Sequence, residues 1–118
     1  GIDEWCDVEL GFPGGATGRS ANAMTAPDFS FTLRIVGTKG DVLVHNFIKP
    51  NEDDRLTIRT KAGTRVEHHG TRTSYSYQLE AFAAHVLHGT PLPIDTADSM
   101  ENMAYVDAAY RAAGMTPR

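Results

Sequence analysis

Two pairs of histidines are the residues whose type and spacing best suit chemistry in this chain. His68 and His69 are adjacent, and His85 and His88 are three residues apart, a spacing that puts both on one face of a helix. Imidazoles can bind zinc, but a catalytic zinc site usually adds a carboxylate or a third histidine at motif spacing, and no His-Glu-x-x-His occurs. We therefore expect no metal site. The first pair ends a polar strand, and the second meets the negative end of a helix dipole.

Other reactive residues lack the partners that catalysis needs. Cys6 has no positive neighbour in sequence that would favour a thiolate, so we expect an ordinary packing residue. Asp53 and Asp54 are adjacent, as are Asp3 and Glu4. Neighbouring residues of a strand point to opposite faces, so neither pair can share a proton donor or a substrate. We expect no catalytic residue in this chain.

Arg72 and Tyr75 are the residues that we expect to contact a substrate. They lie where the last predicted strand leads into the first predicted helix. A planar guanidinium beside a phenol suits a polyhydroxylated or carboxylated ligand. Tyr75 also belongs to the apolar stripe of that helix, so packing is its alternative role.

Asp107 falls in the middle of the apolar face of the second predicted helix, between Met100 and Met103 on the helical wheel. An ionised carboxylate there must be paired, because an isolated buried charge is very costly. Arg111, one turn further on, is the nearest partner, and Arg72 or a tyrosine hydroxyl is the alternative. We expect Asp107 and Arg111 to form a buried polar pair that ties helix to helix. Orientation of a pocket residue is the functional alternative.

The elements that position these residues change period near Ser74. Before it, apolar and polar residues alternate in short runs between turns rich in Gly and Pro, which predicts strands joined as antiparallel hairpins. The expected strands cover residues 8–12, 16–24, 29–35, 42–47, 56–58 and 65–68.

After Ser74 the apolar spacing becomes three to four, which predicts two helices. Thr73 or Ser74 can cap the first helix and Gly89 can end it. The second starts after Asp95 or Thr96 and stops at Gly114. The predicted fold is α+β, an open-faced, largely antiparallel β-sheet with two C-terminal helices packed on one face.

Composition bounds the class of protein. The chain has 118 residues, 41% of them hydrophobic, which suits one compact domain over residues 1–118. A formal net charge of −4 offers no basic field to nucleic acid or to an anionic membrane, so neither is an expected partner. No apolar run approaches the roughly 20 residues that cross a bilayer. A lone cysteine cannot form an internal disulfide, so the expected location is cytoplasmic.

The segment from Arg72 to Arg118 and one hairpin before it carry a pattern of residues with a recognisable order and spacing. The residues are Arg72-Thr-Ser-Tyr75-Ser-Tyr-Gln78-Leu79-Glu80-Ala-Phe82, Gly89-Thr-Pro91, Asp98, Asn102-Met103, Asp107-Ala-Ala-Tyr110-Arg111-Ala-Ala-Gly114 and Leu33-Arg-Ile-Val-Gly37-Thr38-Lys-Gly40-Asp41. This pattern resembles the carboxyl-terminal domain of the Gfo/Idh/MocA family of oxidoreductases.

The resemblance implies a function for the complete protein. Members of the family have a nicotinamide-binding domain followed by an open-sheet domain, which supplies wall residues to a substrate pocket and commonly pairs subunits through its open sheet face. It therefore implies NAD or NADP as cofactor, a homo-oligomer expected to be a dimer, and a small-molecule substrate that is a sugar, a cyclitol or a related alcohol.

The family's cofactor and catalytic residues have no counterpart in this sequence. No Gly-x-Gly-x-x-Gly turn joins a strand to a helix, so no cofactor-binding residue is expected here. The family's lysine lies in a Glu-Lys-Pro-like segment, whereas Lys49-Pro50 follows Ile48 in a loop and carries no catalytic role.

Two classes of function fit the sequence. In the first, the chain is the C-terminal domain of a nicotinamide-dependent oxidoreductase and contributes pocket wall and subunit interface. The alternative is a non-catalytic α+β assembly or ligand-binding module. The first residue is Gly1 rather than Met, which fits either a domain cut from a longer protein or removal of the initiator Met.

Overall fold

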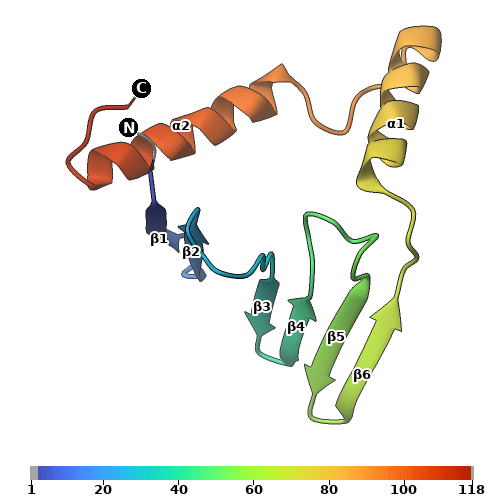
Figure 1. Cartoon of the computed structure of the whole chain (residues 1–118), viewed down its shortest axis with the longest axis horizontal. Coiled ribbons are helices and arrows are strands. Elements are labelled where there is room, and N and C mark those ends of the chain that lie inside the picture. The colour runs from blue at the N-terminus through green and yellow to red at the C-terminus, as the bar shows by residue number, and fades with distance from the viewer. Residues whose placement is uncertain (1–2, 118) are drawn as a thin grey trace. The chain divides into compact units, whose positions relative to one another are not determined.

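The computed structural model describes residues 3–117 and contains six strands and two helices. The chain divides into two compact units, Gly1–Phe29 with Ile94–Arg118 as unit 1 and Ser30–Pro93 as unit 2. Unit 1 holds a two-stranded hairpin and the second helix, and unit 2 holds a four-stranded sheet and the first helix (Figure 1). Each unit has its own sheet, whereas the sequence predicted a single sheet.

The hairpin of unit 1 joins β1 (Trp5–Gly11) to β2 (Thr17–Ala23) in antiparallel pairing. Arg19 Nε donates to the Asp7 carboxylate at 2.8 Å from the neighbouring strand. This bond and the charge of the guanidinium lower the pKa of Asp7. This ion pair is a polar contact between the two strands. The second strand consists of small and polar residues, so its sequence pattern specifies the register of the hairpin only weakly.

The second helix, α2 (Thr96–Ala112), begins at a capping box. The Asp95 carboxylate accepts from the backbone N–H groups of Ala97 and Asp98 at 2.7 and 3.1 Å. The Asp98 carboxylate accepts from the Asp95 N–H at 2.9 Å. These bonds satisfy N–H groups that have no partner within the first turn, so Asp95 is the cap.

Unit 2 contains a four-stranded antiparallel meander. Its strands are β3 (Leu33–Gly37), β4 (Gly40–Val44), β5 (Arg55–Thr60) and β6 (Gly63–His68), and each pairs with the next in sequence (Figure 1). The β3–β4 and β5–β6 turns are short and contain Gly, and a short turn joins strands that are neighbours in the sheet. The sequential strand order is therefore consistent with these turns.

The strand registers give this sheet two different faces. The rows of the apolar face are Leu33, Val44 and Leu56, and then Ile35, Val42 and Ile58. The rows of the mixed face are Arg34, Leu43 and Thr57, and then Val36, Asp41 and Arg59. Arg34 and Leu43 thus share a face. Among residues 3–117, Thr57 is the one buried residue, and its Oγ1 lies 2.8 Å from His45 Nε2.

Gly40 allows β4 and β5 to approach closely at their shared end. Its φ is +153°, and a Cβ on it would lie 2.1 Å from the Arg59 carbonyl oxygen. A side chain at this position would collide with backbone, so the start of β4 requires glycine.

The first helix, α1 (Ser74–His88), has the caps that its sequence predicts. Thr73 Oγ1 accepts from the Ser76 N–H at 3.3 Å, so Thr73 is the N-cap. At the other end Gly89 has a φ of +66° and its N–H donates to the His85 carbonyl at 2.9 Å.

The α+β class and the antiparallel pairing are confirmed. Several strand ends differ from the prediction: β2 covers Thr17–Ala23 rather than 16–24, β3 begins at Leu33 rather than at residue 29, and β4 ends at Val44 rather than at residue 47. Phe29, at the expected start of β3, is 97% exposed and lies at the boundary between the units. The sequence predicted that both helices pack on one face of the sheet. In the structure neither α1 nor α2 has a buried residue, so no helix face is buried as that prediction requires. Within residues 3–117, no helix combines the length and the apolar character needed to cross a membrane.

Candidate functional site

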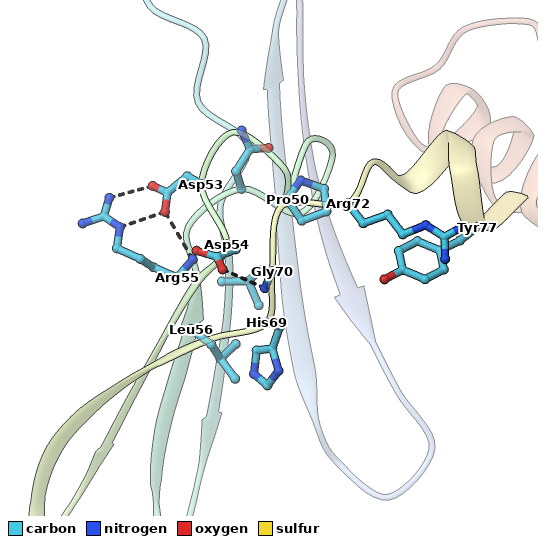
Figure 2. Close-up of a pocket in the computed structure, with 11 residues that line it drawn as sticks. Pro50, Asp53, Asp54, Arg55, Leu56, His69, Gly70, Arg72 and Tyr77 are labelled. Carbon is cyan, nitrogen blue, oxygen red and sulfur yellow. Dashed lines mark hydrogen bonds and ion pairs between the residues drawn. The ribbon is translucent and has the colours of Figure 1, made fainter.

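A hollow of about 300 Å³ lies in unit 2. It is formed by the connection between β4 and β5, the segment that follows β6 and the first turn of α1 (Figure 2). Val44 and Leu56 supply apolar atoms to its lining, and the polar lining residues include Asp53, Asp54, Arg55, His69 and Arg72. The hollow therefore combines two carboxylates and two guanidinium groups with a small apolar surface.

Asp53 and Arg55 form a bidentate ion pair on one side of the hollow (Figure 2). Arg55 Nε donates to Asp53 Oδ1 at 2.8 Å and Nη2 donates to Oδ2 at 2.6 Å. The side-chain hydrogen bonds from Arg55 are the main cause that lowers the pKa of Asp53 to about 2. Both groups are consequently charged at neutral pH and neither can act as a general acid there.

Asp54 joins the start of β5 to the segment that leads into α1. Its Oδ1 lies 2.7 Å from His68 Nδ1. Its Oδ2 accepts from the Gly70 N–H at 2.9 Å (Figure 2). The bond to His68 and then the bond from Gly70 lower the pKa of Asp54, whose side chain is 15% exposed. This carboxylate therefore links the start of β5 to residues 68–70, the segment between β6 and α1.

Arg72 is held by two side chains of α1. Its guanidinium carbon lies 4.6 Å from the centroid of the Tyr77 ring (Figure 2). Its Nη2 forms an ion pair with Glu80. The Glu80 carboxylate raises the pKa of Arg72. A guanidinium that lies on an aromatic face is both oriented and partly shielded from water, and it keeps N–H donors for a ligand.

Tyr77, rather than Tyr75, lines the hollow beside Arg72. Tyr75 is 79% exposed. The two tyrosines are two residues apart, which separates them by about 200° around a helix, so they lie on opposite sides of α1. Of the two expected substrate contacts, the structure brings Arg72 to the hollow and leaves Tyr75 outside it.

Asp107 and Arg111 lie in unit 1, on α2, and are separate from this hollow. Arg111 Nη2 donates to Asp107 Oδ2 at 3.1 Å, which is the predicted partner. The side chains are 63% and 35% exposed for Arg111 and Asp107, so the pair lies on the helix surface rather than in a core. The reason is that no residue of α2 is buried in the structure.

The histidines have separate local partners. His68 bonds to Asp54, His69 Nε2 lies 3.5 Å from Glu67, and His85 Nδ1 lies 2.8 Å from the Thr90 carbonyl. In the described part of the chain, no group of three or more His, Cys, Asp or Glu side chains is placed to hold a metal ion. Cys6 is exposed in unit 1.

Sequence reasoning missed Asp54, Gly70, Tyr77 and Glu80. Asp54 and Gly70 are 16 residues apart, and no local motif signals such a pairing. Glu80 follows Tyr77 by three residues on α1, a spacing that places both beside the residue entering the helix, so this signal was present in the sequence. Chemically, the site offers oriented donors and an aromatic ring for a polar ligand.

The comparisons with known proteins gave one relative. A protein of Rhizobium meliloti named uncharacterized oxidoreductase ORF334 is 29% identical over 122 residues. The match covers 96% of this chain and 36% of that protein. No family model matches the chain, and no solved structure matches it. The chain thus spans about a third of the length of its relative, and the similarity supports a domain related to an oxidoreductase.

Proposed function

We propose that this chain is the substrate-side domain of an NAD(P)-dependent oxidoreductase of the Gfo/Idh/MocA type, acting on a sugar, a cyclitol or a related alcohol. The observation that carries the proposal is the similarity to the R. meliloti oxidoreductase, which runs through 96% of this chain but through 36% of that protein. The α+β architecture with antiparallel sheets and the motifs of the tail agree with the same assignment.

In this proposal the domain contributes a wall of the substrate pocket. Arg72, with Tyr77 beneath it and Glu80 beside it, offers directed N–H donors to hydroxyl or carboxylate oxygens of a substrate. The carboxylates of Asp53 and Asp54 are occupied by Arg55 and by His68 and Gly70. In this proposal Asp53 and Asp54 stabilise the wall of the substrate pocket, and the redox chemistry takes place in another part of the protein.

The nicotinamide cofactor does not fit the residues described here. A dinucleotide site needs several glycines between a strand and a helix, so that backbone N–H groups can approach the pyrophosphate. The strand-to-helix connection in unit 2 joins β6 to α1 and carries Gly70 alone, with its N–H donated to Asp54. We therefore assign NAD or NADP to a separate nucleotide-binding domain of the same protein.

The sheet of unit 2 supplies the proposed subunit interface. Its mixed face combines Arg34 and Asp41 with Leu43 and with Val36, which is 73% exposed. A second copy of the chain would cover these apolar side chains while the charged residues set its register. Light scattering of the protein should give a homo-oligomer, with a dimer as the expected size, and a monomer at high concentration contradicts this part of the proposal.

The assignment is tested by determining the coding sequence that adjoins residue 1. We expect a Gly-x-Gly-x-x-Gly fold, then a Glu-Lys-Pro-like segment and a helix with an Asp/His pair. The complete protein should then reduce NAD⁺ or NADP⁺ in the presence of a sugar, a cyclitol or a related alcohol, followed by the absorbance of the reduced nicotinamide. A start codon directly before Gly1, or tight binding of NADH by the 118-residue chain alone, contradicts the proposal.

A further inference from the structure

A second hollow of about 340 Å³ lies at the hairpin end of the unit 2 sheet. The turn between β3 and β4 contributes Lys39, and the turn between β5 and β6 contributes Lys61. Asp41 and Arg59, which face each other across β4 and β5, form the side that adjoins the strands. The volume lies in the range of roughly 300–1,000 Å³ that is usual for small-molecule sites.

Positive charge exceeds negative charge around this hollow. Arg34 Nε and Arg59 Nη1 both donate to the same oxygen of Asp41, at 3.2 and 3.0 Å. One carboxylate therefore balances two guanidinium groups. Lys39 and Lys61 form no ion pair with any residue between 3 and 117, so their charges are uncompensated. This local excess stands out in a chain whose formal net charge is −4.

The backbone holds the two charged turns in a fixed position relative to each other. Gly40 packs directly on the Arg59 carbonyl, where a Cβ would approach to 2.1 Å, so the two turns are held next to each other. The Asp41 side chain is 15% exposed and holds Arg59 by accepting a hydrogen bond from its Nη1. The other N–H groups of Arg59 can still donate to a ligand. The arginine and the strand ends are therefore positioned before any anion arrives, which lowers the entropic cost of binding.

We propose that this hollow, between Lys39, Lys61 and Arg59, binds the phosphate group of a small phosphorylated ligand. Lysine ammonium groups act as point charges toward phosphate, and arginine adds directed N–H donors to the oxygens. Because the site is open to water and screened by salt, a singly charged carboxylate gains little there, and a group with several negative charges is favoured. The site stands on its own observations and does not depend on the oxidoreductase role.

The test is a titration of the 118-residue chain with inorganic pyrophosphate at constant ionic strength, followed by two-dimensional amide NMR. We expect saturable shifts centred on residues 38–41 and 59–61, and shifts of the same amides with inorganic phosphate at higher concentration. The Lys39→Gln/Lys61→Gln variant should bind about tenfold more weakly. The control Lys49→Gln/Arg65→Gln removes the same net charge outside the hollow and should bind as the unsubstituted chain does.

Each other outcome overturns the proposal. Equal weakening in both double variants means that net charge alone is responsible. Shifts that sodium chloride reproduces at equal ionic strength, or shifts that centre on other residues, mean that no site exists at this hollow. The shift map of the unsubstituted chain decides the matter even if a variant fails to fold, and Lys39→Arg/Lys61→Arg should retain binding because it keeps both charges.

Discussion

Arg72 lies with its guanidinium carbon 4.6 Å from the centroid of the Tyr77 ring, and Glu80, three residues after Tyr77, forms an ion pair with the same guanidinium. The residue that enters α1 is therefore oriented by two side chains of the helix itself. An arginine of this kind is pre-positioned for a ligand, because part of its conformational freedom is already lost. In the proposed function, Arg72 is the residue that contacts a polar substrate.

In the proposed oxidoreductase, exchange of Tyr77 for alanine should lower kcat/KM about tenfold, because a cation–π contact worth roughly 0.5–2 kcal/mol and the orientation of Arg72 are both lost. Arg72→Ala should have at least the same effect. Tyr75→Ala is the matched control, since Tyr75 is 79% exposed and lies outside the hollow. Steady-state kinetics with the true substrate decide: a loss for Tyr75→Ala with normal kinetics for Tyr77→Ala contradicts this assignment.

The Asp53–Arg55 ion pair predicts a pH dependence. The pKa of Asp53 is lowered to about 2, so its ionised form stabilises the folded state at pH values above the ordinary pKa of the unfolded chain. This stabilisation is lost as pH falls from about 4 through about 2. Carbon NMR of the carboxyl group should show a midpoint near 2, and Arg55→Gln should return it to the ordinary range of about 4.

Urea denaturation gives the corresponding stability measurement. Asp53→Asn should destabilise unit 2 at pH 7 and have little effect at pH 2, because the wild-type carboxylate is then becoming protonated. Asp28→Asn is the control, because Asp28 forms no ion pair with residues 3–117. An effect of Asp53→Asn that is equal at both pH values would mean that the ion pair is not its source.

Gly40→Ala should disrupt the pairing of β4 with β5. The new Cβ would lie 2.1 Å from the Arg59 carbonyl oxygen, so the strands must separate at this end, at a cost on the order of 2–4 kcal/mol. Gly37→Ala is the matched control in the same turn, because its Cβ would meet its nearest atom at 3.7 Å. Thermal melts by circular dichroism, with amide exchange at Val42 and Arg59, distinguish the two; equal melting temperatures contradict the close approach.

The caps of α1 should be measurable one at a time. Thr73→Ala removes the side-chain acceptor of the Ser76 N–H and should cost about 1 kcal/mol, and Gly89→Ala should cost a similar amount because its φ is +66°. Thr71→Ala lies before the helix and serves as the control. Far-UV circular dichroism should show reduced helicity for the cap variants alone, whereas an equal loss for Thr71→Ala would show that threonine content rather than capping matters.

Asp107→Ala should have a small effect on the melting temperature of the 118-residue chain. Asp107 and Arg111 form an exposed i, i+4 pair, and such pairs contribute about 0.3–0.5 kcal/mol. A marked fall in melting temperature would instead indicate that the carboxylate is buried, as its place on the apolar face of α2 suggested. Arg111→Gln should give the same small change, since each substitution removes the same contact.

Local chemistry made much of this fold predictable. The hairpin at residues 37–40, the Thr73 and Asp95 caps and the stop at Gly89 depend on a few consecutive residues, and the structure has each of them. Alternation over residues 42–44 and 56–58 likewise set which side chains share a sheet face. Such features follow from φ/ψ preferences and from hydrogen bonds that close within one turn.

What the sequence alone determined was therefore the class of elements, their order and the capped ends of the helices. Only the tertiary structure decided which residues meet, because Asp54 reaches His68 and Gly70, which lie 14 and 16 residues further along the chain. The structure also places Tyr77 rather than Tyr75 beside Arg72. Helical periodicity identifies a face but not what the face meets, since that depends on contacts between segments distant in sequence.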